Sequence, residues 1–174
     1  AAKIADDAVT TDAIADSAVT PAKIANRTRE VFLPASMVKG PGVLDIDADQ
    51  RGVEAVYNAI TTAYLFGVIP QDFVSDAEIV PVICRPSTSA PGTAGFEYGA
   101  WLAANGETAA THSYTDDTLI FDYPVDTIVL LTALDLPDAA AGDTLGVYVS
   151  RVIAGDSGKS FYIRGAILRY TADS

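Results

Sequence analysis

A histidine, an aspartate and a serine occur in an order that could form a nucleophilic triad. His112 is the single histidine, and Ser157 lies within Gly155-Asp156-Ser157-Gly158. In a triad the imidazole takes the proton of the serine hydroxyl while a carboxylate orients the imidazole. The interval between His112 and Ser157 is too short for the two β-barrels between which such groups meet, and Lys159 replaces the glycine that follows this serine motif. We therefore predict that no triad forms and that His112 is a polar loop or strand residue. Because the chain has a single histidine and a single cysteine, we also predict that the protein is not an enzyme.

The tripeptide Gly158-Lys159-Ser160 has the residue types that end a phosphate-binding loop. The first glycine of that motif would fall at Ile153, and the residues that follow alternate as in a strand. A phosphate loop instead opens a helix whose N-terminus faces the anion. A β-hairpin turn therefore explains these glycines better.

Three carboxylates, Asp45, Asp47 and Asp49, stand at alternate positions, as at the start of a calcium loop. Gln50 occupies the place of the turn glycine and Val56 the place of the bidentate glutamate, so the segment is not an EF-hand. The three aspartates are a weak cation candidate; we favour a solvated acidic edge that discourages strand-to-strand aggregation. With one cysteine and one histidine in the chain, we predict neither a metal nor another cofactor.

The net charge of −12, from 11 basic and 23 acidic residues, excludes several partners. An acidic chain without a basic cluster repels phosphate backbones and anionic membrane surfaces. No apolar run approaches the ~20 residues of a membrane-spanning helix. We therefore predict no nucleic-acid partner and no membrane partner.

Composition predicts that these residues are positioned by strands and turns. The chain has 18 Asp but only 5 Glu, with 13 Gly and 9 Pro, and Asp, Gly and Pro favour turns whereas Glu favours helices. Cys84 lies in an apolar run and is predicted to be a buried, unreactive thiol. Short apolar segments recur throughout residues 30–170, which is typical of a sandwich or barrel. The predicted strands are 31–33, 43–46, 53–57, 60–66, 79–84, 95–103, 108–113, 118–122, 126–134, 143–152 and 159–170.

The first 28 residues form a separate, repetitive arm. A large apolar residue recurs every five positions, at Ile4, Val9, Ile14, Val19 and Ile24. This spacing fits neither one helix face nor a heptad seam. One Ile or Val in five cannot order a single chain, so we expect the arm to wrap around copies of itself or against a larger body. A pentapeptide solenoid and a disordered linker are the alternatives.

Two predicted strands of the head, residues 29–174, are apolar on both alternating faces. They are Gly99–Ala103, which contains Trp101, and Thr127–Leu134, which contains Leu130 and Leu131. A strand of a two-layer sandwich normally turns one face to water. We expect these side chains in the core or at a subunit interface, with a covering loop or arm as the alternative.

The arm sequence Ala2-Lys3-Ile4-Ala5-Asp6-Asp7-Ala8-Val9-Thr10-Thr11, with its continuation to Thr28, resembles the decapeptide repeats of bacteriophage tail-fibre, head-fibre and related virion proteins. The segments 68–73, 142–145 and the expected closing hairpin of 149–152 with 163–170 resemble tumour-necrosis-factor-like jelly rolls of phage and virus structural proteins. The resemblance implies an all-β jelly-roll head behind an extended arm, assembled as a homotrimer on the virion exterior, with capsid or tail proteins as partners.

These features predict a structural protein that decorates a capsid or forms a fibre. The alternative is an adhesin head that binds a host glycan or surface protein. For that alternative we expect exposed loop aromatics, such as Tyr98, Tyr114 and Tyr123, to make the contacts.

Overall fold

The structure of the chain is a computed structural model that describes residues 27–40, 44–45, 52–55, 60–84, 94–108, 111–120, 127–152 and 161–173. Within these ranges the chain forms twelve strands and no helix. The described residues accordingly contain no helix that could span a membrane. The prediction of an all-β fold is confirmed.

The strands follow one another from β1 at the start of the described chain to β12 at its end. They are β1 (Arg27–Pro34), β2 (Met37–Lys39), β3 (Leu44–Asp45), β4 (Gly52–Ala55), β5 (Thr61–Val68), β6 (Phe73–Cys84), β7 (Ala94–Ala103), β8 (His112–Ile120), β9 (Ile128–Leu130), β10 (Leu134–Asp135), β11 (Thr144–Val152) and β12 (Phe161–Ala172).

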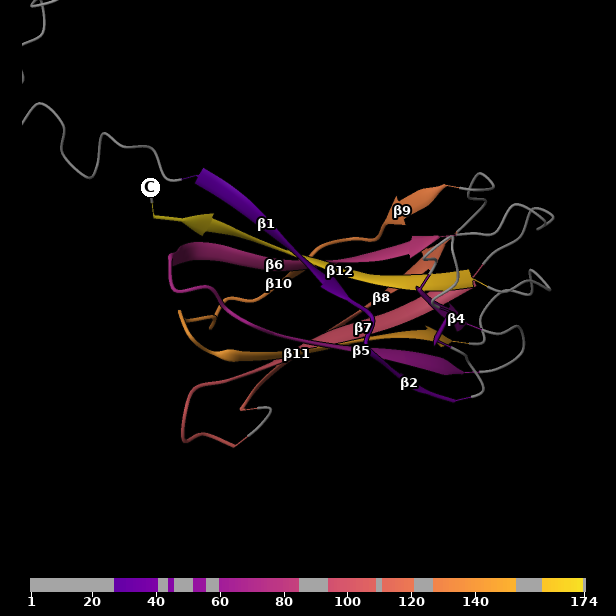
Figure 1. Ribbon diagram of the computed structural model, residues 1–174, viewed down its shortest axis with the longest axis horizontal. Helices are drawn as coiled ribbons and strands as arrows, with labels where there is room; N and C mark the ends of the chain where they lie inside the picture. Colours follow the sequence, from indigo (N-terminus) through magenta and orange to yellow (C-terminus); the bar gives the residue numbers. More distant parts are fainter. Residues whose placement is uncertain are drawn as a thin grey trace, which may run out of the picture.

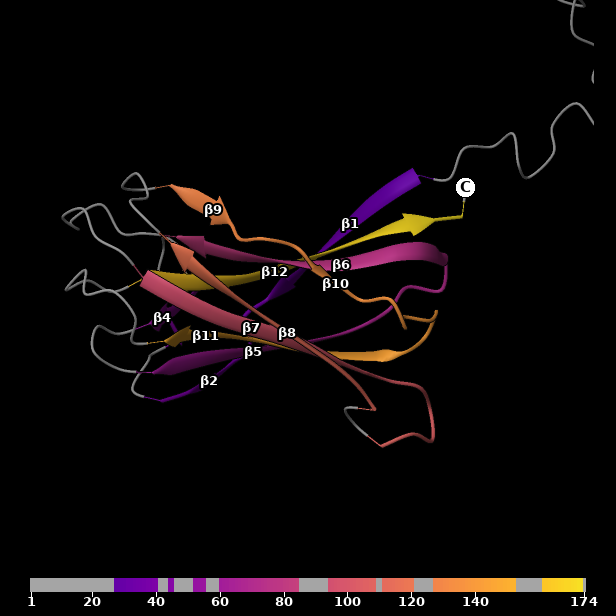
Figure 2. The same ribbon diagram turned by 180° about the vertical axis from the view of Figure 1, so that it is seen from behind.

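Two antiparallel sheets face one another as the layers of a jelly-roll β-sandwich (Figures 1 and 2). The five-stranded sheet has the order β2-β5-β11-β7-β8. The other sheet has β6 and β12 at its centre, with β9 and β10 beside β6, and with β1 and β4 beside β12, followed by β3. The chain crosses between the sheets repeatedly, so strands distant in sequence become neighbours.

Successive side chains of the five-stranded sheet point alternately to an inner, buried face and to an outer face. Leu65, Val147 and Ala100 lie opposite one another on β5, β11 and β7, and all three are fully buried. Burial of such side chains is the main stabilising contribution to the fold, about 1.5–3 kcal/mol for each large one. The largest fully buried side chains are Tyr98, Phe96, Phe161, Leu65, Ile69, Ile79, Ile83, Leu102, Leu136, Leu145 and Ile163.

On the outer face of the other sheet, an ionic row ties three strands together. Arg169 on β12 contacts Glu30 on β1 at 2.9 Å and Glu78 on β6 at 2.6 Å. Hydrogen bonds to these two carboxylates raise the pKa of the Arg169 guanidinium, and the bond to Glu30 has the larger effect. The row therefore holds a fixed positive charge between two negative ones.

Several predicted elements need correction. The two strands expected at 108–113 and 118–122 are one strand, β8, and the single run at 126–134 divides into β9 and β10. The expected closing hairpin is wrong because β11 and β12 belong to different sheets. Strand β2 was not predicted, and Cys84 is half-buried rather than buried.

The repetitive residues Ile4, Val9, Ile14, Val19 and Ile24 lie outside the described residues. Strand β1 begins at Arg27, so the last two residues assigned to the arm belong to the sandwich. Of the three candidate aspartates, Asp45 is placed by its backbone in β3, whereas Asp47 and Asp49 lie outside the described residues. Among described residues, no group of three or more His, Cys, Asp or Glu side chains could hold a metal ion.

Candidate functional site

The outer face of the five-stranded sheet carries a cluster of four aromatic side chains, which we call the aromatic face: Tyr64, Phe66, Trp101 and Tyr148. Two rows cross its three central strands: Phe66–Gly146–Trp101 and, two residues further along, Tyr64–Tyr148–Gly99. The Trp101 and Tyr148 rings lie 5.2 Å apart between centroids and are tilted by 30°. Phe66 is 59% exposed, and the other three side chains are half-buried.

Two strand glycines allow these rings to lie close to the sheet. A Cβ atom at Gly99 would lie 2.5 Å from Tyr148 Cε1, and one at Gly146 would lie 3.1 Å from Trp101 Cε3. Each ring therefore covers the glycine of the neighbouring strand. Glycine within a strand often marks such close approach, and here the neighbouring ring occupies the space that a side chain would otherwise fill.

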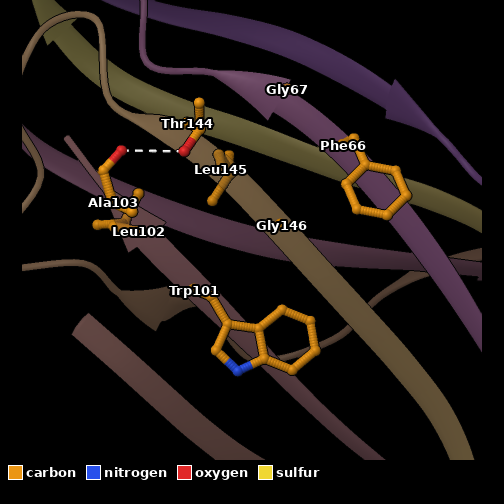
Figure 3. Close-up of a pocket in the computed structure, with 8 residues that line it drawn as sticks. All are labelled: Phe66, Gly67, Trp101, Leu102, Ala103, Thr144, Leu145 and Gly146. Carbon is orange, nitrogen blue, oxygen red and sulfur yellow. Dashed lines mark hydrogen bonds between the residues drawn. The ribbon is translucent and has the colours of Figure 1, made fainter. Parts of the chain in front are cut away.

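An apolar pocket of about 360 Å³ opens at one end of the aromatic face (Figure 3). Phe66 and Trp101 stand on the two strands that flank β11, and Gly146 lies between them (Figure 3). Thr144 also lines the pocket, and its hydroxyl donates a hydrogen bond of 2.9 Å to the carbonyl oxygen of Ala103. The remaining lining residues are Gly67, Leu102, Ala103 and Leu145.

A polar pocket of about 300 Å³ lies beyond Trp101, which lines both pockets. The hydroxyls of Thr62 and Ser150 are 2.9 Å apart and hydrogen-bonded. Tyr148 donates its hydroxyl proton to Glu97 Oε1 at 2.9 Å. Tyr64 and Thr115 complete the lining.

Burial and the hydrogen bond to Glu97 raise the pKa of Tyr148 from 10.0 to about 12. The phenol therefore stays neutral at ordinary pH and remains a donor. A carboxylate offers about four lone-pair sites, so the bond from Tyr148 leaves Glu97 able to accept further hydrogen bonds. Likewise, one proton of the Thr62–Ser150 pair is used within the pair, and the other hydroxyl proton can be donated outward.

No protein-family model matches the chain, and no curated protein matches its sequence. Solved structures with a similar course of the chain include three carbohydrate-binding modules. The xylan-binding module CBM15 is 14% identical with a TM-score of 0.46, covering 86% of this chain and 100% of its own. TmCBM61, solved with β-1,4-galactotriose, is 8% identical with a TM-score of 0.39, covering 83% of this chain and 88% of its own. The family 11 module from Clostridium thermocellum, solved with a β-1,3-1,4-mixed-linked tetrasaccharide, is 10% identical with a TM-score of 0.36, covering 87% and 92%.

Because these TM-scores lie below 0.5, the function of the site rests on the residues of this chain. The two pockets offer flat rings, neutral donors and a carboxylate acceptor side by side. Such a surface suits a ligand that presents both C–H faces and hydroxyl groups, since apolar walls with a few placed polar groups are typical of small-molecule sites.

The three residues predicted to lie in the core or at a subunit interface occupy different parts of the structure. Trp101 lies on the outer face of the five-stranded sheet, at the centre of the candidate site. Leu130 is 49% exposed on β9 at the edge of the other sheet, while Leu131 is buried in the core at 5%. Trp101 and Leu130 therefore belong to different surfaces, and subunit contacts by either remain a prediction.

Of the expected loop aromatics, the two that the structure describes do not line the candidate site. Tyr98 was predicted to be exposed, but it is fully buried in β7 and donates its hydroxyl proton to the carbonyl oxygen of Thr132 at 3.0 Å. Tyr114 lies on β8 and donates to Asp138. Tyr123 lies outside the described residues.

His112 is the first residue of β8, as expected of a polar strand residue, and its Nδ1 lies 3.5 Å from Asp138 Oδ2. Ser157 lies outside the described residues. The absence of a triad therefore stays a prediction.

Sequence reasoning missed Tyr64, Phe66, Tyr148 and Glu97. A signal was present: in both Tyr64-Leu65-Phe66 and Gly146-Val147-Tyr148, outward positions carry aromatic or glycine residues around an aliphatic one. Only the cross-strand register places these two segments and Trp101 side by side.

Proposed function

We propose that the sandwich binds a neutral glycan on the aromatic face. The proposal depends on one observation. An aromatic pair, Trp101 and Tyr148, lies directly beside a polar pocket that contains Glu97, on one open sheet surface. A pyranose ring has apolar C–H faces that stack on aromatic rings, while its hydroxyls pair with donors and acceptors at its edge. The site offers both kinds of contact.

The length of the site favours an oligosaccharide over a single sugar. The residues of β11 that line the two pockets extend from Thr144 to Ser150. At about 3.3 Å per strand residue, this stretch is about 20 Å long. The ligand would therefore occupy several consecutive positions along the strand.

Charge supports a neutral ligand. Glu97 lines the polar pocket, and the chain carries twelve excess negative charges. Anionic ligands would be repelled at this surface. Uncharged hydroxyls, by contrast, can donate to the Glu97 carboxylate in a charge-assisted hydrogen bond.

A specific observation favours a second candidate, subunit packing on the same face. Met37, Phe66 and Val68 are exposed apolar side chains of this sheet surface. Charged residues are depleted at the centre of protein interfaces, because their desolvation must be compensated. The position of Glu97 and the concave pocket beside Gly146 therefore favour the glycan.

Isothermal titration of the full chain with neutral oligosaccharides tests the proposal. Trp101→Ala removes the central ring and is expected to weaken binding about 30-fold, as for an aromatic hot spot of about 2 kcal/mol. Phe32→Ala is the matched control, since Phe32 is an aromatic, 51% exposed, on β1 of the other sheet. Equal losses from both variants, or no binding at all, would overturn the glycan proposal.

We further propose that the arm assembles this head as a homotrimer on the exterior of a virion. The five-residue apolar repeat of residues 1–28 supports this role, because so sparse a repeat needs copies of itself or a larger body to become ordered. Glycan binding by the head would then be the adhesive function of a fibre or capsid decoration.

A further inference from the structure

The apolar pocket presents hydrocarbon on its walls and floor. The Trp101 atoms closest to a Cβ built at Gly146 are Cε3 and Cζ3, on the edge of the indole opposite its N–H. Figure 3 shows the indole nitrogen on the side of the ring away from Gly146 and Phe66. The donor of Trp101 is therefore not directed between the two rings.

Thr144 supplies the pocket with an acceptor but not a donor. Its hydroxyl proton is used in the bond to the Ala103 carbonyl oxygen. A hydroxyl oxygen has two lone pairs, so Thr144 Oγ1 can still accept a hydrogen bond. A ligand hydroxyl placed between Phe66 and Trp101 would lose water without gaining a partner on these rings, whereas a methyl group would gain by burial.

We propose that the apolar pocket receives the acetamido group of an N-acetylhexosamine, with its methyl between Phe66 and Trp101 and its N–H donating to Thr144 Oγ1. An acetamido group pairs a methyl with an adjacent N–H, which is the combination that this pocket accepts. The pocket volume of about 360 Å³ admits this substituent together with part of the sugar ring. This inference rests on the proposed glycan function and specifies its ligand class.

The test compares two oligosaccharides of equal length by isothermal titration against the full chain. Chitin oligosaccharides and cello-oligosaccharides share the β-1,4 backbone and differ in carrying an acetamido group or a hydroxyl at C2. We expect at least about tenfold tighter binding of the chitin oligosaccharide, in line with the gain from one methyl and one hydrogen bond.

Variants of residues that line the apolar pocket test whether this pocket causes the preference for the chitin oligosaccharide. Gly146→Ala places a methyl on the floor and is expected to bring the ratio of the two affinities close to one. Thr144→Val keeps the shape but removes the acceptor, so the ratio should fall several-fold, whereas Thr144→Ser should retain it. Thr171→Val on β12 of the other sheet is the matched control and should leave the ratio unchanged.

The outcomes separate the two proposals. Equal binding of both oligosaccharides, lost on Trp101→Ala, would overturn the acetamido assignment and leave the glycan function standing. Preference for chitin oligosaccharides that survives Gly146→Ala would also overturn the pocket assignment. Binding of neither oligosaccharide nor any other neutral glycan would overturn both.

Discussion

Gly99 and Gly146 show how a missing side chain shapes a surface. Each lies under the aromatic ring of a neighbouring strand, but their surroundings differ. A Cβ at Gly99 would meet the backbone oxygen of Tyr114 at 2.5 Å as well as Tyr148, whereas one at Gly146 would meet only the Trp101 ring, at 3.1 Å. Backbone cannot move aside as a side chain can.

We therefore predict that Gly99→Ala destabilises the protein more than Gly146→Ala does. Overpacking costs about 1–3 kcal/mol, and we expect Gly99→Ala in the upper part of that range. Urea denaturation of both variants measures the difference. Equal midpoints for the two variants would contradict this account of the glycines.

The Tyr148–Glu97 pair predicts a pH dependence at the same site. The fold raises the pKa of Tyr148 from 10.0 to about 12, first by burial and then through Glu97. Because the folded state favours the protonated phenol, this stabilising contribution is complete below pH 10.0 and is lost as pH rises through about 12. In Glu97→Gln the pKa should fall part of the way towards 10.0, since burial remains.

Ultraviolet absorbance of the phenolate follows this titration. Tyr148→Phe serves as the control, because it removes one high-pH titration step and leaves that of Tyr114, whose pKa is also raised to about 12 by burial and by Asp138. An unchanged titration curve in Glu97→Gln would show that Glu97 has no part in the shift.

Residue types alone could not separate Trp101 from Tyr98. The two residues are three positions apart on β7, so they must point to opposite faces. Because apolar residues occupy both alternating faces of this segment, the pattern leaves open which residue faces inward. The register against β11 decides it, since Trp101 lies opposite Gly146 on the outer face.

At the scale of elements, β12 organises the larger sheet because β6, β1 and β4 all pair with it. Arg169 reinforces this arrangement by joining Glu30 and Glu78 across β12. Without the cation, the two carboxylates on the strands that flank β12 would lose their shared partner.

We predict that Arg169→Met lowers the free energy of unfolding by up to about 1 kcal/mol, the usual range for partly exposed ion pairs. The Arg169 side chain is 34% exposed, so salt should reduce the loss. Urea denaturation at low and high salt measures both effects. Arg164→Met on the same strand is the control, and an equal loss there would refute a specific role for the ionic row.

Strand positions could be predicted from the sequence where one face of the strand is apolar. The prediction was wrong for a strand with polar residues at the edge of a sheet. Asp116-Asp117 lies between the two strands that were predicted here, and aspartate favours turns, yet both residues belong to β8. In the structure β8 is an edge strand, where charged side chains are tolerated and discourage aggregation. The hairpin of β11 with β12 failed because proximity in sequence does not determine which sheet a strand joins.

At the scale of the whole molecule, charge and assembly separate along the chain. The first 28 residues carry three basic and four acidic side chains, so eleven of the twelve excess negative charges belong to the head. A strongly acidic head remains soluble by self-repulsion, while a nearly neutral arm can associate with copies of itself.

We predict that the full chain is a trimer and that a shortened chain beginning at Asn26, which keeps β1 intact, is a monomer. Light scattering of both chains measures their molar masses. Monomers in both cases would refute assembly through the arm, and trimers in both would place the interface on the head. The trimer should also bind a glycan-coated surface far more tightly than the monomer, through multivalency.

The pairing of β1 with β12 also determines how the sandwich responds to mechanical force. Arg27 lies directly opposite Ala172, so both ends of the described sandwich lie side by side at the same end of one sheet (Figure 1). A force that pulls these ends apart acts on one pair of hydrogen bonds at a time and unzips the two strands. A force between the arm and a ligand on the opposite sheet instead loads the body of the sandwich. A tethered head should therefore yield at low force when stretched end to end, yet resist when it is stretched through a bound glycan.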